Sequence, residues 1–260
     1  MLKAILYDKD GTLMQFDAFW VPVARAAIRK IVESEIKNSR ENKTKAGEKI
    51  RSDETTDKII EEICIKIERL VGITGETAAP HGILCGGTYG QFATEITAAL
   101  KEFGLDCAVD KAAVEDAVAQ SVKYGKIVPT CENLRSSLLK AREKAAVYVV
   151  TTDDREVTEI CLKTLGIDDL FDGIYCDDGK TPHKPNPFAA DEIAKNSGAE
   201  KSEIYMIGDT PTDENFAKNA QINFVCVGGD EDLLSRSALK AANAGEATDL
   251  ILKIEEAKQA

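Results

Sequence analysis

The chain has 260 residues, of which 43% are hydrophobic and 30% charged, and its formal net charge is −12 at pH 7. This length accommodates one large domain or a core with a smaller satellite, and the composition is that of a globular protein with a sizeable core. The acidic balance argues against a surface for nucleic acid or anionic membranes, since both need basic patches. An anionic substrate would therefore have to be attracted locally, by a metal ion or a placed lysine.

The sequence carries no targeting or disulfide signal. No apolar run reaches the roughly 18–20 residues of a membrane span, and Asp8 interrupts the N-terminus before a signal-peptide core could form. Seven cysteines, an odd number without a C-x-x-C pair, indicate buried thiols of a reducing compartment. With only two histidines in the sequence, a metal site would use oxygen ligands. We therefore expect a cytoplasmic protein.

The first element is an apolar run, Ala4 to Tyr7, that predicts a strand leading into Asp8 and Asp10. Because strand side chains alternate between faces, both aspartates would face one pocket and Lys9 would point away from it, with little effect on chemistry. Gly11 would let the chain turn away tightly. Two close carboxylates repel unless a cation or a proton lies between them. Taken alone, this stretch fits an acidic pocket or merely an acidic turn.

Residues 16–128 are predicted to form an all-helical domain inserted after the first strand. Apolar residues recur there at three- and four-residue spacing, which is typical of amphipathic helices. The polar stretch 38–57 is predicted to be an exposed loop or a frayed helix hairpin, and the Gly- and Pro-containing stretch 74–90 to be a loop. The helices are expected at 19–36, 55–72, 91–103 and 110–124.

Residues 1–15 and 129–260 are predicted to form an α/β core. Strands are expected at 145–150, 173–176, 203–207, 222–227 and 249–252. Helices are expected at 131–144, 155–165, 187–196, 214–219, 233–244 and near the C-terminus. This alternation predicts a Rossmann-like parallel sheet with helices on both faces, and ligands of such sheets bind at the carboxyl ends of the strands.

Polar residues follow the second core strand at the same expected edge. Thr151 and Thr152 are predicted to open a helix, where a hydroxyl and free backbone N–H groups form an anion site. The alternative is that one threonine or Asp153 is simply an N-cap. Both interpretations can hold, because a cap and an anion site use neighbouring donors.

Two further polar clusters belong to the same edge. Lys184 lies among three prolines that stiffen its backbone, which favours a placed positive charge over a solvated one. Gly208 permits a turn after a strand, Asp209 follows it, and Asp213 could return to the same place across the first turn of a helix. Carboxylates of this kind suit Mg²⁺.

These motifs resemble those of the haloacid dehalogenase-like (HAD) hydrolases. The resemblance rests on D-K-D-G-T-L at 8–13, a threonine after an apolar strand, Lys184-Pro185 and G-D-x-x-x-D at 208–213, in the family's order. The helical insert after the first motif is similar to the cap of the phosphoglycolate phosphatase-like branch. Asp10 matches the second aspartate of the family's phosphatases and phosphomutases, which its dehalogenases lack.

The resemblance implies a Mg²⁺-dependent phosphatase of a small phosphate monoester. Asp8 would be the nucleophile and Asp10 the general acid and base. Mg²⁺ would bind to Asp8, the backbone carbonyl of Asp10, Asp209 and Asp213. The phosphate would be held by Gly11, Thr151, Thr152 and Lys184. The partner would be a small phosphorylated metabolite, phosphoglycolate- or sugar-phosphate-like, with no nucleic acid or membrane, and the protein would act as a monomer or homodimer.

Other interpretations stay open. A phosphomutase resembling β-phosphoglucomutase would use the same core residues, and a non-catalytic phosphate-binding module would use the same fold. In the insert, Trp20 is expected in the core of a helix face and Arg25 at a solvated or ion-paired surface position. The segment 81–90 is a candidate cap loop; the alternative is that its glycines serve only a turn.

Overall fold

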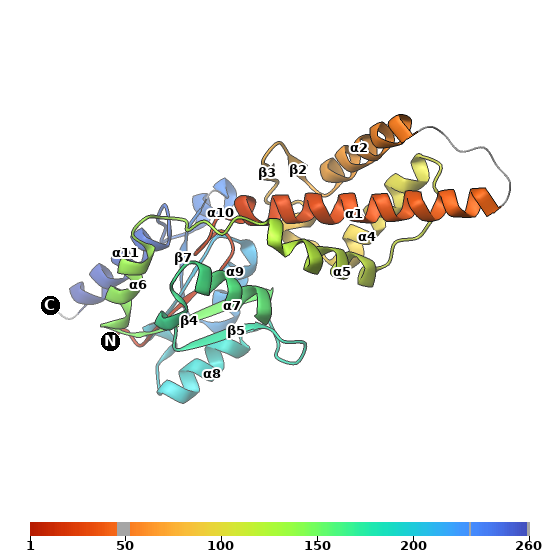
Figure 1. Cartoon of the computed structure of the whole chain (residues 1–260). Helices are drawn as coiled ribbons and strands as arrows, with labels where there is room; N and C mark the ends of the chain where they lie inside the picture. Colours follow the sequence, from red (N-terminus) through yellow and green to blue (C-terminus); the bar gives the residue numbers. More distant parts are fainter. Residues whose placement is uncertain (46–52, 229, 259–260) are drawn as a thin grey trace. The chain divides into compact units, whose positions relative to one another are not determined.

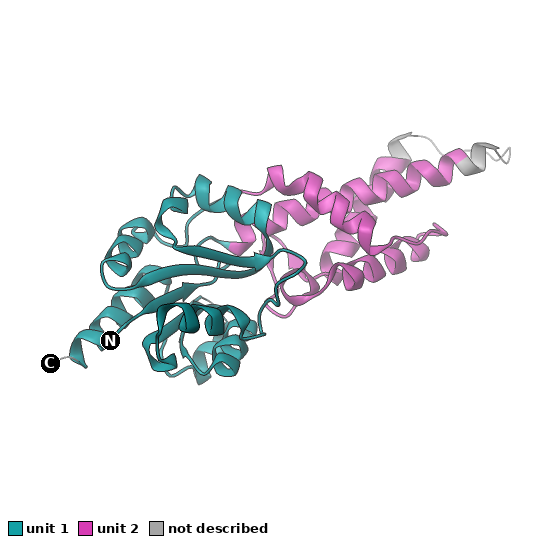
Figure 2. Ribbon diagram, turned by 90° about the horizontal axis from the view of Figure 1, so that it is seen from below, with its two compact units in different colours: residues 1–15, 127–260 teal, residues 16–126 magenta. Residues whose placement is uncertain are grey.

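The structure is a computed structural model, described over residues 1–45, 53–228 and 230–258. The chain divides into two compact units, shown in Figure 2. Unit 1 comprises Met1–Gln15 and Ile127–Ala260, and unit 2 comprises Phe16–Lys126. The sequence placed the second boundary at 128/129, whereas the contacts place it at 126/127.

Unit 1 is built on a parallel five-stranded sheet of order β5-β4-β1-β6-β7 (Figure 1). Every neighbouring pair in this sheet is parallel. This confirms the predicted α/β fold with a Rossmann-like sheet. The strands are β1 (Ala4–Tyr7), β4 (Ala146–Asp154), β5 (Gly173–Asp177), β6 (Ile204–Gly208) and β7 (Asn223–Cys226).

Helices cover both faces of this sheet because strand side chains alternate between them. Ile5 and Tyr7 pack into one buried cluster with residues of α6, α7 and α11. Ala4 and Leu6 pack into another with residues of α8 and α9. The unit 1 helices are α6 (Leu134–Arg142), α7 (Arg155–Thr164), α8 (Phe188–Ser197), α9 (Pro211–Ala220), α10 (Glu231–Arg236) and α11 (Ala244–Ala257).

The C-terminal part of unit 1 differs from the sequence prediction. Residues 249–252, predicted as a strand, lie inside α11, and the helix predicted over 233–244 is the shorter α10. A short apolar run does not by itself distinguish strand from helix. The wider pattern does, because the buried positions Ala247, Ile251 and Glu255 recur every four residues, as a helix face requires. Asn243 caps this helix by accepting a hydrogen bond from the N–H of Glu246 at 3.0 Å.

Unit 2 is mainly helical and has its own core. Its helices are α1 (Phe16–Lys45), α2 (Asp53–Leu70), α3 (Ile83–Gly86), α4 (Tyr89–Glu102) and α5 (Lys111–Ser121). Fully buried side chains from α1, α2 and α4, such as Ile28, Ile63 and Ile96, show that these helices bury apolar faces. Among the described residues of both units, no helix combines the length and the apolarity needed to cross a membrane.

Of the two alternatives predicted for the polar stretch 38–57, the helical one agrees with the structure. Residues 38–45 and 53–57 belong to α1 and α2, whereas the rest of the stretch, 46–52, lies outside the described residues. The prediction of an all-helical unit is wrong, because β2 (Ile73–Thr74) and β3 (Thr77–Ala78) pair as an antiparallel hairpin. Gly75 opens its two-residue turn with φ +57°, a conformation for which glycine is the least strained residue.

Candidate active site

The site begins where β1 and β6 end side by side. Tyr7 is in register with Ile207, and the N–H of Asp8 donates to the Ile207 carbonyl at 2.9 Å. Asp8 therefore lies level with Gly208, the last residue of β6, and Asp209 follows at once. Asp213 returns to this place from the first turn of α9. The local sequence thus brings three carboxylates to one edge, as predicted.

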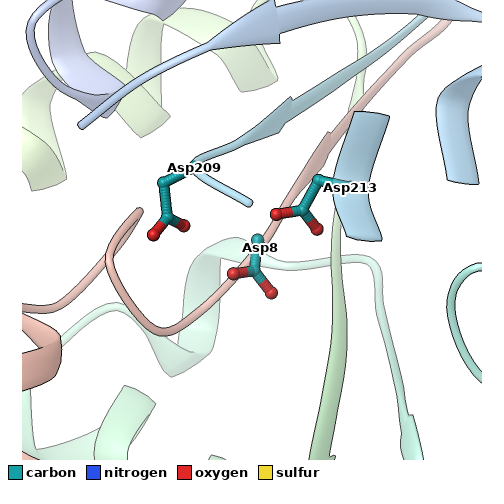
Figure 3. Close-up of side chains that lie close together, drawn as sticks. All are labelled: Asp8, Asp209 and Asp213. Atoms are coloured by element: carbon teal, nitrogen blue, oxygen red, sulfur yellow. The ribbon is translucent and has the colours of Figure 1, made fainter. Parts of the chain in front are cut away.

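The carboxylates of Asp8, Asp209 and Asp213 form a compact cluster. One oxygen of each lies within 4.8 Å of the others. Figure 3 shows the three side chains around a common space. Asp8 and Asp213 are buried, and Asp209 is partly exposed. Like charges at such distances repel, so the cluster needs positive charge or protons to persist.

Two glycines make room for these carboxylates. Gly11 has φ +79°, and a Cβ there would lie 2.0 Å from Oδ2 of Asp209. A Cβ on Gly208 would lie 2.4 Å from Cβ of Asp213. Both distances are far below van der Waals contact, so side chains at these positions would displace the acidic groups. Gly11 therefore serves close approach as well as the turn that the sequence predicted.

Lys184 supplies positive charge inside the cluster. Its Nζ donates to Oδ1 of Asp8 and to Oδ1 of Asp213, each at 2.5 Å. The lysine side chain is 3% exposed, so these ion pairs are shielded from water. Removing one member of such a buried network leaves uncompensated charge and is strongly destabilising.

The pKa values in the cluster follow from burial and charge. Burial raises the pKa of Asp8 to about 7; the charge of Asp213 adds to the rise and Lys184 opposes it. Burial, followed by the charges of Asp8 and Asp213, also raises the pKa of Asp209. For Lys184, burial alone would lower the pKa, but the charges of Asp213 and Asp8 outweigh it and raise it. The site therefore has a deficit of positive charge.

Two hydroxyl groups that received no role in the sequence analysis orient the aspartates. Thr12 Oγ1 donates to Oδ1 of Asp209 at 3.0 Å. Thr210 Oγ1 and N–H donate to Oδ2 of Asp213 at 2.6 and 3.1 Å, while the Asp213 N–H donates back to Thr210 Oγ1 at 3.3 Å. This is a capping box at the start of α9. The spacing of Thr210 and Asp213 could have indicated it from the sequence.

The prediction that Thr151 and Thr152 open a helix is wrong. β4 continues through both residues to Asp154, and α7 begins at Arg155. Neither threonine nor Asp153 is the N-cap; Asp154 is, and its Oδ1 accepts from the N–H of Val157 at 2.9 Å. Pairing with β5 extends β4 beyond its apolar run, since Asp154 is in register with Asp177.

The two threonines differ in their surroundings. Thr151 is buried and lines a small cavity together with Lys184, whereas Thr152 is exposed. No helix starts at these two residues, so helix geometry does not supply the anion site predicted there. The β4–β5 ladder is irregular between Val150 and Asp154, and neither threonine has a register partner on β5.

Asp10 lies beside the cluster and outside the group of three carboxylates. β1 ends at Tyr7, so strand alternation does not continue to Asp10. Its carboxylate instead accepts from Lys9 Nζ at 2.8 Å. Lys9 is fully buried and also pairs with Asp153 at 2.8 Å, although the sequence predicted that it points away from the site.

The residues present fit a hard divalent cation. The donors are carboxylate oxygens. Among the described residues, no cysteine or histidine joins the group of Asp8, Asp209 and Asp213. Mg²⁺ prefers such oxygen ligands, with water and phosphate completing its shell. The pKa values of Asp8 and Asp209, raised by burial and then by mutual repulsion, point the same way, because a bound cation would stabilise the charged carboxylates.

The candidate cap residues lie within unit 2. Trp20 packs edge-to-face on Phe19, with ring centroids 5.1 Å apart, which agrees with a place on a packed helix face. Arg25 pairs with Glu68 at 3.1 Å and with Glu76 at 2.9 Å, which confirms an ion-paired surface position. The segment 81–90 contains α3 and the start of α4, so it is only partly a loop.

Comparisons with solved structures give the fold. A predicted phosphoglycolate phosphatase from Haemophilus somnus 129PT is 16% identical, with a TM-score of 0.62 and coverage of 98% of each chain. A candidate β-phosphoglucomutase from Thermotoga maritima is 15% identical, with a TM-score of 0.61 and coverage of 97% of this chain and 100% of that one. The candidate HAD hydrolase YfnB from Bacillus subtilis, bound to magnesium, is 15% identical, with a TM-score of 0.57 and coverage of 96% and 98%.

Among functionally curated proteins, no sequence matches this chain. Comparison with protein-family models does identify a family. The model of the haloacid dehalogenase-like hydrolases matches residues 2–221, which include every motif residue from Asp8 to Asp213. The chain belongs to the haloacid dehalogenase-like hydrolases.

Proposed function

We propose that this hydrolase is a Mg²⁺-dependent phosphatase of a small phosphate monoester. The observation that carries the proposal is the buried cluster of Asp8, Asp209 and Asp213 around Lys184, with Asp10 beside it. A phosphate dianion can enter such an acidic site only if positive charge accompanies it. Lys184 and a divalent cation would supply that charge.

Asp8 would be the nucleophile. Its carboxylate oxygen attacks phosphorus, the bond to the leaving alcohol breaks, and an aspartyl-phosphate forms on Asp8. Lys184 holds one oxygen of Asp8 at 2.5 Å and thereby fixes the direction of the other. Water then attacks the phosphorus, which releases inorganic phosphate and restores the carboxylate.

Asp10 would be the general acid and then the general base. It gives a proton to the leaving oxygen in the first step and accepts one from water in the second, as one residue can in a two-step displacement. Gly11, Thr151, Thr152 and Lys184 would hold the transferring phosphoryl group. For Thr151 the support is its place in a cavity with Lys184, whereas exposed Thr152 would contribute only its backbone N–H.

Mg²⁺ would be held by Asp8, Asp209, Asp213 and the backbone carbonyl of Asp10. When bound, it neutralises the charge between the nucleophile and the phosphate, a contribution of several kcal/mol. The protein prepares this by positioning: Thr12 and Thr210 orient Asp209 and Asp213. The magnesium named with YfnB supports the choice of metal by fold similarity alone.

Unit 2 would act as the cap that excludes bulk water and contacts the leaving group. A capped site favours a small phosphorylated metabolite, and the phosphoglycolate phosphatase and β-phosphoglucomutase named among similar structures favour a phosphoglycolate- or sugar-phosphate-like ester. The net charge of −12 supports a partner that is neither nucleic acid nor membrane. We also propose a cytoplasmic monomer or homodimer.

The test is Mg²⁺-dependent phosphate release from a panel of small phosphate esters. We expect release from some members, loss on chelation, and a fall of at least about 10³-fold in Asp8→Asn. The matched control is Asp169→Asn, the same change in an exposed ion pair with Arg135, which should leave the rate unchanged. Normal turnover by Asp8→Asn would exclude Asp8 as the nucleophile.

Other outcomes identify the alternatives. A trapped aspartyl-phosphate from a sugar bisphosphate, without phosphate release, indicates a phosphomutase. Tight binding of phosphate esters without turnover indicates a non-catalytic module. Asp10→Asn should slow both half-reactions by about 10²-fold or more, and an unchanged rate would refute its role.

A further inference from the structure

The structure contains a fully buried lysine between the two aspartates of the first motif. Lys9 is 0% exposed. Lysine is almost never fully buried unless its charge is paired. The proposed chemistry assigns it no role. Its ammonium group is nonetheless next to the residue that is proposed to move protons.

The contacts of Lys9 connect the first motif to β4. Its Nζ lies 2.8 Å from Oδ1 and 2.7 Å from Oδ2 of Asp10, so it engages both oxygens of one carboxylate. The same Nζ lies 2.8 Å from Oδ2 of Asp153 and 3.9 Å from Sδ of Met14. The ammonium group therefore joins two carboxylates that come from different strand ends.

Asp153 is itself anchored to the backbone. Its Oδ1 accepts from the N–H of Asp154 at 2.9 Å, and its N–H donates to Oγ1 of Thr151 at 3.2 Å. Its side chain is 10% exposed, and that of Asp10 is 16% exposed. The carboxylate of Asp10 is thus held, through Lys9, against the end of β4, an interior strand of the sheet.

Stability does not explain this arrangement. Burying an ion network carries a desolvation penalty, and apolar residues of similar volume often serve stability equally well or better. Apolar residues at both positions 9 and 153 would leave neither buried charge there. What an apolar residue could not do is hold the carboxylate of Asp10 in one orientation.

We propose that Lys9 is a positioning residue for Asp10. With Asp153 as its second anchor, it fixes the direction of the Asp10 carboxylate for proton transfer to the leaving oxygen. Lys9 itself stays buried and contacts no substrate. This inference rests on the proposed function, because it gives Lys9 a role in the step assigned to Asp10. Small losses of alignment at a reacting group reduce rates strongly.

The primary variant is Lys9→Met/Asp153→Asn. Lys9→Met alone would leave Asp153 buried without its cation and could unfold the chain. The double variant removes both buried charges and keeps the Asp154 hydrogen bond through the asparagine oxygen. The matched control is Lys140→Met/Asp249→Asn, the same two changes in an exposed ion pair with a 3.1 Å contact. Circular dichroism and thermal melting establish that both variants are folded.

The readout compares two leaving groups. An alkyl phosphate needs a proton on its leaving oxygen, whereas p-nitrophenyl phosphate releases a stable phenolate without one. kcat/KM reports the steps up to phosphoryl transfer, in which Asp10 acts as the acid. We expect kcat/KM of the double variant to fall by about 10–10²-fold for the alkyl ester and by less than about 3-fold for the aryl ester. The control should match wild type on both.

A second comparison uses Asp10→Asn as the background. If Lys9 acts through Asp10, adding Lys9→Met/Asp153→Asn to Asp10→Asn should produce little further loss on the alkyl ester. The inference is overturned if the double change lowers kcat/KM as much in the Asp10→Asn background as in wild type. It is also overturned if kcat/KM falls equally for both esters, because either result means a merely structural role. A folded double variant with wild-type kinetics overturns it as well. If the wild type itself hydrolyses no ester, the proposed function fails first and the inference falls with it.

Discussion

Individual side chains at the sheet edge determine what the site can do. Lys184 is the clearest case, because one ammonium group is shared by Asp8 and Asp213 at 2.5 Å each. Asp209 lies in the same cluster and is oriented from the other side by Thr12. Charge compensation in this site therefore depends on very few atoms.

Lys184→Met tests this dependence. Without the ammonium group, Asp8 and Asp213 remain buried and repel each other, so the free energy of unfolding should fall by about 3–5 kcal/mol in the absence of divalent cations. Urea denaturation measures the change. Lys140→Met in an exposed ion pair should cost at most about 1 kcal/mol. Equal effects of the two substitutions would contradict the compensating role of Lys184.

Gly11→Ala tests the close approach of the chain to Asp209. The added Cβ would lie 2.0 Å from Oδ2 of Asp209, so either the loop or the carboxylate must move. We expect phosphate release to fall by about 10²-fold or more. Gly104→Ala shares the positive φ, +77°, but meets nothing within 4 Å, so it should lose stability without losing activity. Comparable activities of the two variants would show that Gly11 serves only the turn.

At the scale of elements, the parallel sheet brings distant segments of the chain to one edge. β1 ends beside β6, so Asp8 meets Asp209, and α9 starts there so that Asp213 joins them. The capping box of α9 couples a structural device to the site, because Thr210 binds the same carboxylate that holds Lys184. The start of this helix therefore affects both stability and chemistry.

Thr210→Ala should show both effects. Loss of the N-cap should lower the free energy of unfolding by about 1–2 kcal/mol, as measured by urea denaturation. Phosphate release should also decrease, because Asp213 loses the hydroxyl donor at 2.6 Å and keeps only the backbone N–H donor at 3.1 Å. Thr210→Ser keeps the hydroxyl and should restore both quantities. If Thr210→Ala has lower stability but normal activity, the N-cap of α9 contributes to stability and not to catalysis.

For the whole molecule, the acidic cluster links stability to pH and to metal. Burial raises the pKa of Asp8 to about 7 and also raises the pKa of Asp209. In the unfolded chain these carboxyls titrate near about 4. The folded state therefore holds protons more tightly, and the contribution of these groups to stability falls as pH rises from about 4 through about 7.

Mg²⁺ should reverse this loss. A cation that takes the place of these protons binds more strongly at higher pH, and binding to the folded state raises its stability. We expect the increase in Tm on adding Mg²⁺ to be at least about 3 °C larger near pH 8 than near pH 5. Thermal melts at both pH values measure it. Asp8→Asn should flatten the difference, and an equal Mg²⁺ effect at both pH values would contradict the linkage.

The general architecture and much of the candidate site follow from local signals in the chain. Alternating apolar runs and amphipathic segments are local signals, and parallel strands can only present their carboxyl ends at a common edge. Asp8, Lys184, Asp209 and Asp213 therefore meet as predicted, and the family model confirms the class of enzyme. The roles of these residues in turnover stay predictions.

Long-range packing sets the features in which it conflicts with local signals. Pairing of Asp154 with Asp177 of β5 extends β4 past Thr151 and Thr152, and packing of one helix face against the sheet makes residues 249–252 part of α11. Lys9 is the sharpest example: strand alternation pointed it away, but β1 ends at Tyr7, and burial then leaves its ammonium group with Asp10 and Asp153 as partners. Such contacts join residues far apart in the chain, and no periodicity in the sequence encodes them.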